Sequence, residues 1–210
     1  IVALQLLLTS SSQGRANAAN SGNTGAPSES TTCRSCHGSG FSTTVSIVIR
    51  DSSRTPVSSY VPGAIYDAEF TVNATGAQRY GFQMVSLDSR NAPVNGFTTP
   101  AANTRLITLG TGRQYAEHAG ASVSNIFSVK WTAPASGTGN VTFYGGGAAV
   151  NNNRNTGGDG GNITTLSLTE NTTVGITEPT LSNELLIYPN PTRNVLNIEN
   201  TSNLIKNTTA

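Results

Sequence analysis

The stretch Ile65-Tyr-Asp-Ala-Glu-Phe-Thr-Val-Asn73 alternates between apolar and polar side chains from its second residue on. Its larger apolar positions share one face of an extended chain: Tyr66, Ala68, Phe70 and Val72. A period of two residues is typical of a half-buried antiparallel strand, because successive side chains of a strand point to opposite faces of the sheet. This stretch therefore predicts a strand that covers a hydrophobic core.

Similar patterns recur along the chain and are separated by turn signals. The pair Pro62-Gly63 predicts a type II turn before the first strand, since proline fixes φ and glycine accepts a positive φ. In 126–133, Phe127, Val129 and Trp131 share a face. The other strand candidates are 45–49, 80–87, 105–109, 114–118, 140–144 and 163–168, and 96–103 is expected to be a loop. This spacing predicts an all-β, antiparallel sandwich.

The composition agrees with that fold class. The chain has 210 residues, with 12 Lys and Arg against 11 Asp and Glu and a formal net charge of +1. Abundant Gly, Ser, Thr and Asn suit turns and short strands better than long helices. Because no dense run of Lys and Arg is present, we expect neither a nucleic-acid partner nor a membrane-surface function.

Both cysteines of the chain and one of its two histidines lie in the pentapeptide Cys33-Arg-Ser-Cys-His37. A c-type haem is attached through such a pattern: two thiols three positions apart add to the two porphyrin vinyl groups, and the next imidazole binds the iron. The pattern predicts one covalent haem c, with Cys33 and Cys36 as thioether donors and His37 as proximal iron ligand. We expect the pentapeptide to form a short helical turn.

The residue on the other side of the iron would decide what this haem does. His118 and Met84 are the two strong candidates left in the chain. We favour His118 as sixth ligand, because Met84 shares a predicted strand face with Phe82, and a methionine beside an aromatic residue in a strand more often packs in a core. An open iron would instead permit ligand binding or peroxidase-like chemistry.

Two interpretations without haem stay open. Cys33 and Cys36 could form a disulfide, or they could belong to a zinc or redox Cys-x-x-Cys site. Zinc would be short of ligands, because after the pentapeptide only His118 or a carboxylate could complete a tetrahedron. No Gly-x-Ser-x-Gly motif is present, and Gly145-Gly-Gly147 lacks the lysine of a phosphate-binding loop, so neither a hydrolase of that kind nor a phosphate-loop enzyme is indicated.

The asparagine-rich stretch 151–161 has a polar alternation that could bind calcium. Calcium prefers several carboxylates, and Asp159 is the only one in this stretch. We therefore favour an open hairpin loop. Phe41, just after the pentapeptide, is a candidate for apolar cover of a haem, whereas four aromatic residues are expected in the sandwich core: Tyr66, Phe70, Phe127 and Trp131.

The two ends of the chain differ in composition from its middle. Residues 1–8 are apolar but too few to span a bilayer, and Ala16-Asn-Ala18 resembles a small-residue cleavage site, so 1–18 is predicted to be a truncated signal peptide. Export suits covalent haem attachment. The expected order continues with a linker and haem motif (19–44), a β-sandwich (45–170), a second linker (171–184) and a short C-terminal module (185–210).

The stretch 25–159 resembles the choice-of-anchor V family of bacterial surface domains, which is similar to the reelin N-terminal (reeler) β-sandwich. The matching segments are Cys33–His37, Tyr60–Tyr66, Gly81–Gln83, Tyr115–His118, Trp131–Pro134, Gly139–Phe143 and Gly158-Asp159. The resemblance implies an immunoglobulin-like sandwich at the cell surface with a Cys-x-x-Cys-His motif before its first strand. It implies no known reaction.

A second resemblance covers Leu186-Ile-Tyr-Pro-Asn-Pro-Thr-Arg-Asn-Val-Leu-Asn-Ile198, which is similar to the start of a type A sorting domain of the type IX secretion system of Bacteroidota. It implies that the secretion machinery is a partner and that the protein reaches the outer surface of a Gram-negative cell or is released from it. The match breaks off at the end of the printed sequence.

Together these observations predict an exported surface monohaem c-type domain for electron transfer or redox sensing, with an unidentified redox partner. The alternative is a haem-free sandwich that recognises a partner or a surface glycan, with a Cys33–Cys36 disulfide. We expect no membrane span in the mature chain.

Overall fold

The computed structural model describes residues 13–38 and 40–171, together with the backbone of 185–188 and 197–200. The chain divides into two compact units, Ile1–Thr172 and Thr173–Ala210. In the second unit, β11 (Leu185–Tyr188) pairs antiparallel with β12 (Asn197–Asn200). Among the described helices, none has the length and apolar character needed to cross a membrane.

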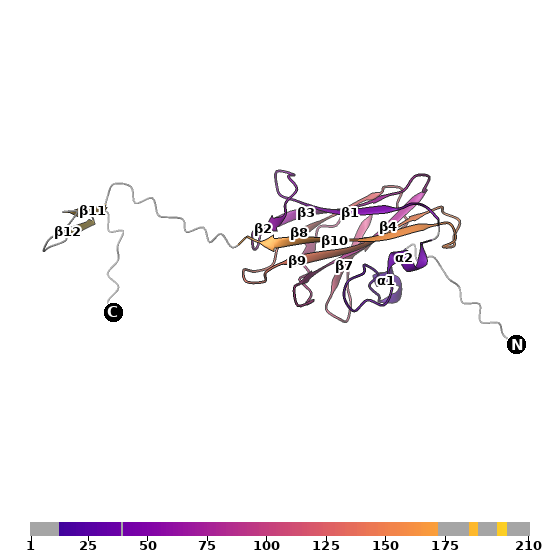
Figure 1. Cartoon of the computed structure of the whole chain (residues 1–210), viewed down its shortest axis with the longest axis horizontal. Helices are drawn as coiled ribbons and strands as arrows, with labels where there is room; N and C mark the ends of the chain where they lie inside the picture. The colour runs from indigo at the N-terminus through magenta and orange to yellow at the C-terminus, as the bar shows by residue number, and fades with distance from the viewer. Residues whose placement is uncertain (1–12, 39, 172–184, 189–196, 201–210) are drawn as a thin grey trace. The chain divides into compact units, whose positions relative to one another are not determined.

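The first unit is a sandwich of two sheets (Figure 1). The smaller sheet has the order β1-β3-β8-β5, and the larger has the order β2-β10-β9-β4-β7-β6. Neighbouring strands are antiparallel, except that β2 runs parallel to β10. The strands are β1 (Thr44–Arg50), β2 (Ser59–Tyr60), β3 (Ile65–Asn73), β4 (Arg79–Asp88), β5 (Phe97–Thr98), β6 (Thr104–Thr108), β7 (Gln114–His118), β8 (Ile126–Thr132), β9 (Val141–Val150) and β10 (Gly160–Glu170).

Aromatic side chains from both sheets fill the space between them. Trp131 and Phe143 form an edge-to-face pair with ring centroids 4.9 Å apart, and Phe82 stacks on Phe127 at 4.4 Å. The four aromatic residues expected in the core are all buried: Tyr66, Phe70, Phe127 and Trp131. The predicted all-β sandwich is confirmed, and burial of these large side chains is the main contribution to its stability.

The strand pattern of the sequence matches the structure for most strands. The structure adds the two-residue strand β2, extends the strand expected at 163–168 to Gly160–Glu170, and differs in two further places. The expected loop 96–103 contains the two-residue strand β5, which pairs with β8 at the edge of the smaller sheet. The strand expected at 140–144 continues to Val150 as β9. Its glycines at 145 and 147 face the core. A Cβ atom would collide with Phe70 at position 145 and with Val45 and Val72 at position 147, so glycine is needed at both.

The predicted hairpin loop after β9 and the predicted turn before β3 are both present. β9 and β10 pair antiparallel and are joined through the asparagine-rich stretch. In the turn, the amide of Ala64 donates to the carbonyl of Val61 at 3.1 Å, and Gly63 has a φ of 75°. A positive φ at the third residue is what a type II turn requires.

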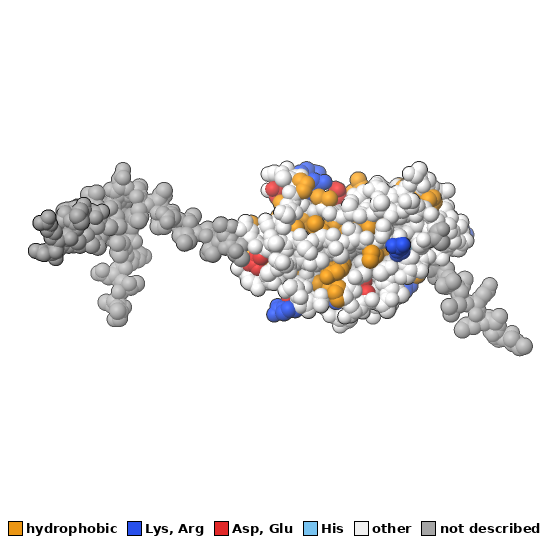
Figure 2. Space-filling model, viewed as in Figure 1, with side chains coloured by type: hydrophobic (Ala, Val, Ile, Leu, Met, Phe, Trp, Pro, Cys, Tyr) orange, Lys and Arg blue, Asp and Glu red, His pale blue; other side chains and the backbone are white. Residues whose placement is uncertain are grey.

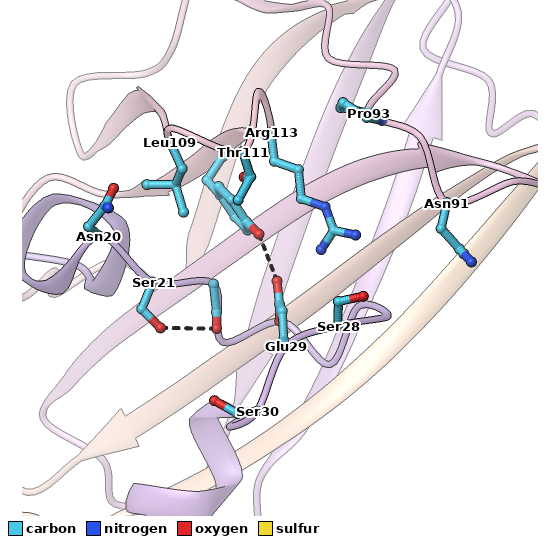
Figure 3. Close-up of a pocket in the computed structure, with 12 residues that line it drawn as sticks. Asn20, Ser21, Ser28, Glu29, Ser30, Asn91, Pro93, Leu109, Thr111 and Arg113 are labelled. Atoms are coloured by element: carbon cyan, nitrogen blue, oxygen red, sulfur yellow. Dashed lines mark hydrogen bonds between the residues drawn. The ribbon is translucent and has the colours of Figure 1, made fainter.

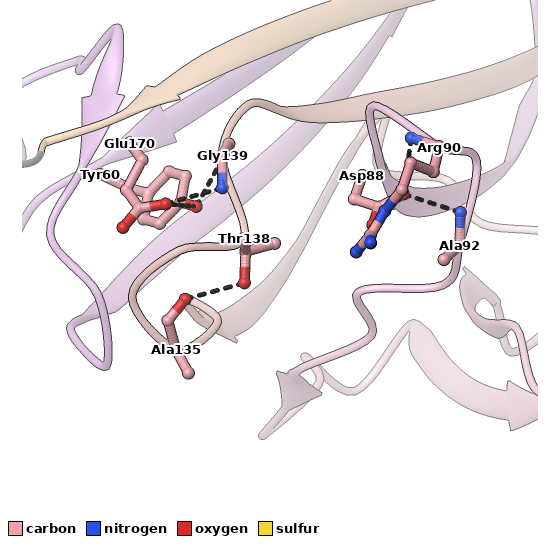
Figure 4. A network of polar contacts seen from close by, with 8 residues as sticks. All are labelled: Tyr60, Asp88, Arg90, Ala92, Ala135, Thr138, Gly139 and Glu170. Atoms are coloured by element: carbon pink, nitrogen blue, oxygen red, sulfur yellow. Dashed lines mark hydrogen bonds and ion pairs between the residues drawn. The ribbon is translucent and has the colours of Figure 1, made fainter.

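The carboxylate of Glu170, at the end of β10, closes the turn between β8 and β9 (Figure 4). It accepts hydrogen bonds from the amides of Gly137 at 2.8 Å and Gly139 at 2.6 Å, and these bonds lower its pKa. The hydroxyl of Tyr60 donates to the carbonyl of Gly139 at 2.6 Å, and burial raises the Tyr60 pKa to about 12. These contacts hold β2 and β10 to this turn.

Residues 13–32, here called the N-terminal strap, cross the outer face of the larger sheet. The strap begins with the short helix α1 (Arg15–Ala19). Ala16 and Ala26 of the strap are buried in a second apolar cluster with Val85, Leu87 and Tyr115 of the sheet. The sequence predicted an extended linker from residue 19; the structure instead packs this segment on the sandwich. Residues 1–12 of the predicted leader lie outside the described residues, and 15–18 belong to α1.

Candidate functional site

The Cys-x-x-Cys-His pentapeptide lies directly after the strap. Cys33–Cys36 form the one-turn helix α2, as predicted, and His37 follows as its C-cap. The helix begins with a capping box: the side chains of Thr32 and Ser35 each bond to the backbone of the other residue. The amide of Cys33 donates to the carbonyl of Asn23 at 3.0 Å, which ties this turn to the strap.

Cys33 and Cys36 are free thiols in different surroundings. Cys33 faces the larger sheet at Gly146, where a Cβ atom would lie only 2.9 Å from the Cys33 sulfur. Glycine therefore permits this close approach. Burial raises the pKa of the Cys33 thiol to about 12, with a smaller contribution from the negative charge of Glu29. Cys36 is exposed.

In the haem-free protein, iodoacetamide at pH 8 is expected to alkylate Cys36 well before Cys33. With a pKa of about 12, only about one Cys33 side chain in ten thousand is a thiolate at that pH. Peptide mapping by mass spectrometry after timed quenching would measure both rates, and urea-unfolded protein, in which the rates should converge, is the control. Equal rates in the folded protein would contradict the raised pKa of the Cys33 thiol.

The same pKa predicts how stability changes with pH. Because the Cys33 pKa is raised in the folded state, the unfolded chain releases this proton first. The contribution of the protonated Cys33 thiol to the free energy of unfolding is fully present below the ordinary thiol pKa of 9.0. This contribution is lost as the pH rises toward about 12.

The imidazole of His37 is held by a buried carboxylate. Nδ1 of His37 lies 2.9 Å from Oδ2 of Asp159, and the Asp159 side chain is fully buried. Oδ1 of Asp159 accepts a hydrogen bond from the amide of Asn151 at 3.0 Å, and its carbonyl accepts one from Gly40 at 2.7 Å. The carboxylate therefore orients the His37 ring through Nδ1. The bond from Asn151 fixes the carboxylate, and the bond from Gly40 fixes the backbone of Asp159.

In the loop between β9 and β10, the asparagine side-chain oxygens accept hydrogen bonds from the backbone of the same loop. The side-chain oxygens of Asn151, Asn153 and Asn155 each accept a hydrogen bond from the backbone amide two residues further on. Such Asx turns stabilise a loop without a metal ion. The open hairpin that the sequence favoured over a calcium site agrees with this arrangement.

Of the two candidates for a sixth iron ligand, His118 lies at the end of a strand and Met84 lies in the core. Nδ1 of His118, at the end of β7, lies 3.1 Å from the amide nitrogen and 3.0 Å from the carbonyl oxygen of Phe82 on β4. Met84 is fully buried in the core. It therefore lies on the opposite face of the larger sheet from Cys33 and is not brought to the pentapeptide, in agreement with its interpretation as a core residue. Phe41 also packs against the core cluster.

The donor set of the pentapeptide fits a c-type haem. One helical turn carries both thiols and is followed directly by the imidazole. A histidine that binds a metal through one ring nitrogen commonly donates from the other to a carboxylate, and Asp159 supplies that acceptor for His37. Within the described part of the chain, no group of three or more His, Cys, Asp and Glu side chains is arranged to hold a metal ion by itself.

Two further acidic residues, which the sequence did not single out, hold the strap. The Glu117 carboxylate is fully buried and accepts hydrogen bonds from the amides of Ala16 and Asn17 at 2.8 and 2.9 Å, and from the Gln83 side chain at 3.1 Å. Glu29 accepts from the amides of Thr24 and Gly25 and from the hydroxyl of Tyr115. The only sequence signal for Glu117 was its spacing: Tyr115 and Glu117 are two residues apart in a short strand, so their side chains lie on the same face of the sheet.

The fold and site thus define an antiparallel β-sandwich whose outer face carries a strap and a Cys-x-x-Cys-His turn. No family model matches the chain, and no curated protein is significantly similar to it in sequence. The Reelin-N domain of F-spondin is similar in structure at 18% identity over 66% of this chain and 94% of that chain, with a TM-score of 0.43. The human F-spondin reeler domain is similar at 16% identity over 63% of this chain and 91% of that chain, with a TM-score of 0.42.

Proposed function

We propose that this protein is an exported monohaem c-type domain that serves electron transfer or redox sensing. Cys33 and Cys36 would hold the haem through thioether bonds, and His37 would bind the iron from the proximal side. The hydrogen bond between Nδ1 of His37 and the buried carboxylate of Asp159 carries the proposal. It occupies one ring nitrogen of His37 and leaves Nε2 for the iron.

A surface histidine without a ligand would gain little from this arrangement. Burying a carboxylate costs free energy unless hydrogen bonds compensate it, and here two groups bond to the Asp159 carboxylate: the His37 ring and the amide of Asn151. A ring fixed in this way is prepared to bind a metal before the metal arrives. When bound, the haem would supply a one-electron redox centre.

We propose His118 as the sixth ligand. It is the second histidine of the chain, and its ring is positioned beside the backbone of Phe82 on β4. Two histidine ligands would give a lower reduction potential than histidine with methionine. With both axial positions filled, the haem would carry electrons rather than react with peroxide.

We also propose that the protein reaches the outer cell surface through the type IX secretion machinery. The support is the similarity of 186–198 to a type A sorting domain and of 25–159 to choice-of-anchor V surface domains. The described strands at the two ends of this segment, β11 and β12, pair antiparallel. A redox partner at the surface would then be needed, since a lone haem cannot pass electrons over long distances.

The test is a reduced-minus-oxidised visible spectrum with a pyridine haemochrome assay, on full-length protein from a host with c-type maturation machinery. A covalent c-type signature that disappears in the Cys33→Ala/Cys36→Ala variant is expected. Ligand bands that change in His118→Ala would support His118 as the sixth ligand. The control is Met84→Leu, in which these bands should stay unchanged. Folded, matured protein without covalent haem would overturn the proposal and leave the haem-free binding sandwich, whose disulfide would be visible by mass spectrometry.

A further inference from the structure

A polar cavity lies between the strap and two loops of the larger sheet (Figure 3). Its volume is about 420 Å³, within the range of small-molecule sites. One wall is formed by strap residues such as Ser21, Ser28 and Glu29, another by Asn91 in the loop after β4, and a third by Arg113 in the hairpin between β6 and β7. The pentapeptide is not among its lining residues, so this cavity is separate from the proposed haem site.

The cavity contains one acidic and one basic group, and both contact Tyr115. Both oxygens of Glu29 already accept hydrogen bonds, from the amides of Thr24 and Gly25 and from the hydroxyl of Tyr115. The Arg113 side chain hydrogen-bonds to Tyr115, but it takes part in none of the ion pairs formed by the described residues, and a guanidinium has five N–H donors. Figure 3 shows its guanidinium directed toward the space between Glu29 and Asn91. The cavity therefore offers a cation together with hydroxyl and amide groups.

The walls of the cavity are held in place by their own hydrogen bonds. Asp88 accepts from the amides of Arg90 at 2.8 Å and Ala92 at 2.9 Å, which fixes the turn that carries Asn91 (Figure 4). Asn95 joins this loop to the next hairpin by donating to the carbonyl of Gly112 at 3.0 Å and accepting from the amide of Gln114 at 2.8 Å. A preformed cavity loses little conformational entropy when a ligand binds.

We propose that this cavity binds an acidic sugar, a small polyhydroxylated carboxylate of the uronic acid type. The guanidinium of Arg113 would pair with the carboxylate, since Arg forms two parallel hydrogen bonds with such a group. The hydroxyls of Ser21 and Ser28 and the amide of Asn91 would bind the sugar hydroxyls. The site is open at the surface, as recognition of a sugar at the end of a glycan requires. It does not depend on the proposed haem.

The test is a titration of the full chain with sodium glucuronate and, separately, with glucose, followed by isothermal calorimetry or saturation-transfer NMR. Glucuronate is expected to bind at least about tenfold more tightly than glucose, because glucose lacks the group that pairs with the guanidinium. Arg113→Gln is expected to weaken glucuronate binding about tenfold. Arg54→Gln, an exposed arginine in the turn between β1 and β2, should leave binding unchanged.

Three outcomes would overturn the proposal: no saturable binding of glucuronate by the folded wild-type chain, equal affinity for glucose and glucuronate, or unchanged binding in Arg113→Gln. Inorganic phosphate added as competitor provides a fourth test. Displacement of glucuronate by phosphate at equal concentration would show a simple anion site and overturn the sugar assignment. Since Arg113 is only partly buried, its replacement should leave the urea unfolding midpoint unchanged, which confirms that the variant is folded.

Discussion

Replacing Glu117 with alanine is expected to release the N-terminal strap and to lower the free energy of unfolding by about 3 kcal/mol. The carboxylate is fully buried and accepts three hydrogen bonds, from the amides of Ala16 and Asn17 and from the side chain of Gln83. Alanine would leave the amides of Ala16 and Asn17 without this acceptor, and the bond from Ala16 is buried, which makes its loss more costly than that of an exposed contact. The Gln83 side chain would keep its hydrogen bond to the carbonyl of Ser21. Urea unfolding would measure the change in stability.

Hydrogen exchange of peptides that cover 14–32 would show whether the strap itself is released. Their protection should fall in Glu117→Ala, while the core strands keep theirs until the whole domain unfolds. Glu69→Ala is the matched control, because Glu69 also lies in a strand but makes only a partly exposed ion pair with Arg50 at 3.8 Å. Such surface pairs contribute about 0–1 kcal/mol. Unchanged exchange of the strap in Glu117→Ala would contradict its role as anchor.

The second large effect is expected at the proposed haem. Asp159→Asn should raise the reduction potential by about 60 mV or more, which corresponds to a tenfold change for one electron. A carboxylate that accepts the Nδ1 proton of a histidine makes its other nitrogen a stronger ligand and so stabilises the more highly charged ferric iron. Asparagine keeps a similar shape but removes the charge. A spectroelectrochemical titration would measure the potential.

The matched control is Asp51→Asn, which removes the same charge from an exposed turn where Asp51 accepts from the amides of Ser53 and Thr55. Its potential should stay close to that of the wild type, since exposed charges are screened by water and salt. If both variants carry haem and Asp159→Asn has the same reduction potential as Asp51→Asn, Asp159 is not the group that tunes His37. Absence of haem would instead count against the proposed function itself.

Local patterns in the sequence were sufficient for most of the fold. The alternation in 65–73 predicted β3 with the observed bounds, because the side chains of a strand alternate between core and solvent. Turn chemistry at Pro62-Gly63 and the spacing of apolar residues predicted the turn and the neighbouring strands. The pattern failed at the strap, where Ser, Gly and Asn carry no periodicity, although Ala16 and Ala26 are buried.

The site was predictable in part for the same reason. The five residues Cys33–His37 are contiguous, so their helical turn could be predicted from the sequence, and the covalent haem stays a prediction. Asp159 was noticed only as a possible calcium ligand, and its contact with His37 joins residues 122 positions apart. Polar residues that are buried on the outer face of a sheet, such as Glu117 and Gln83, look like ordinary solvent-facing positions in an alternating strand.

The sequence by itself determined the all-β class, the positions of the main strands and the pattern that predicts a c-type haem. These depend on residues close together in the chain. Only the tertiary structure decided that the strap covers the larger sheet, that Asp159 holds His37 and that Arg113 faces a polar cavity. Each of these depends on which strands become neighbours, and pairing between distant segments is set by the packing of the whole core rather than by local preference.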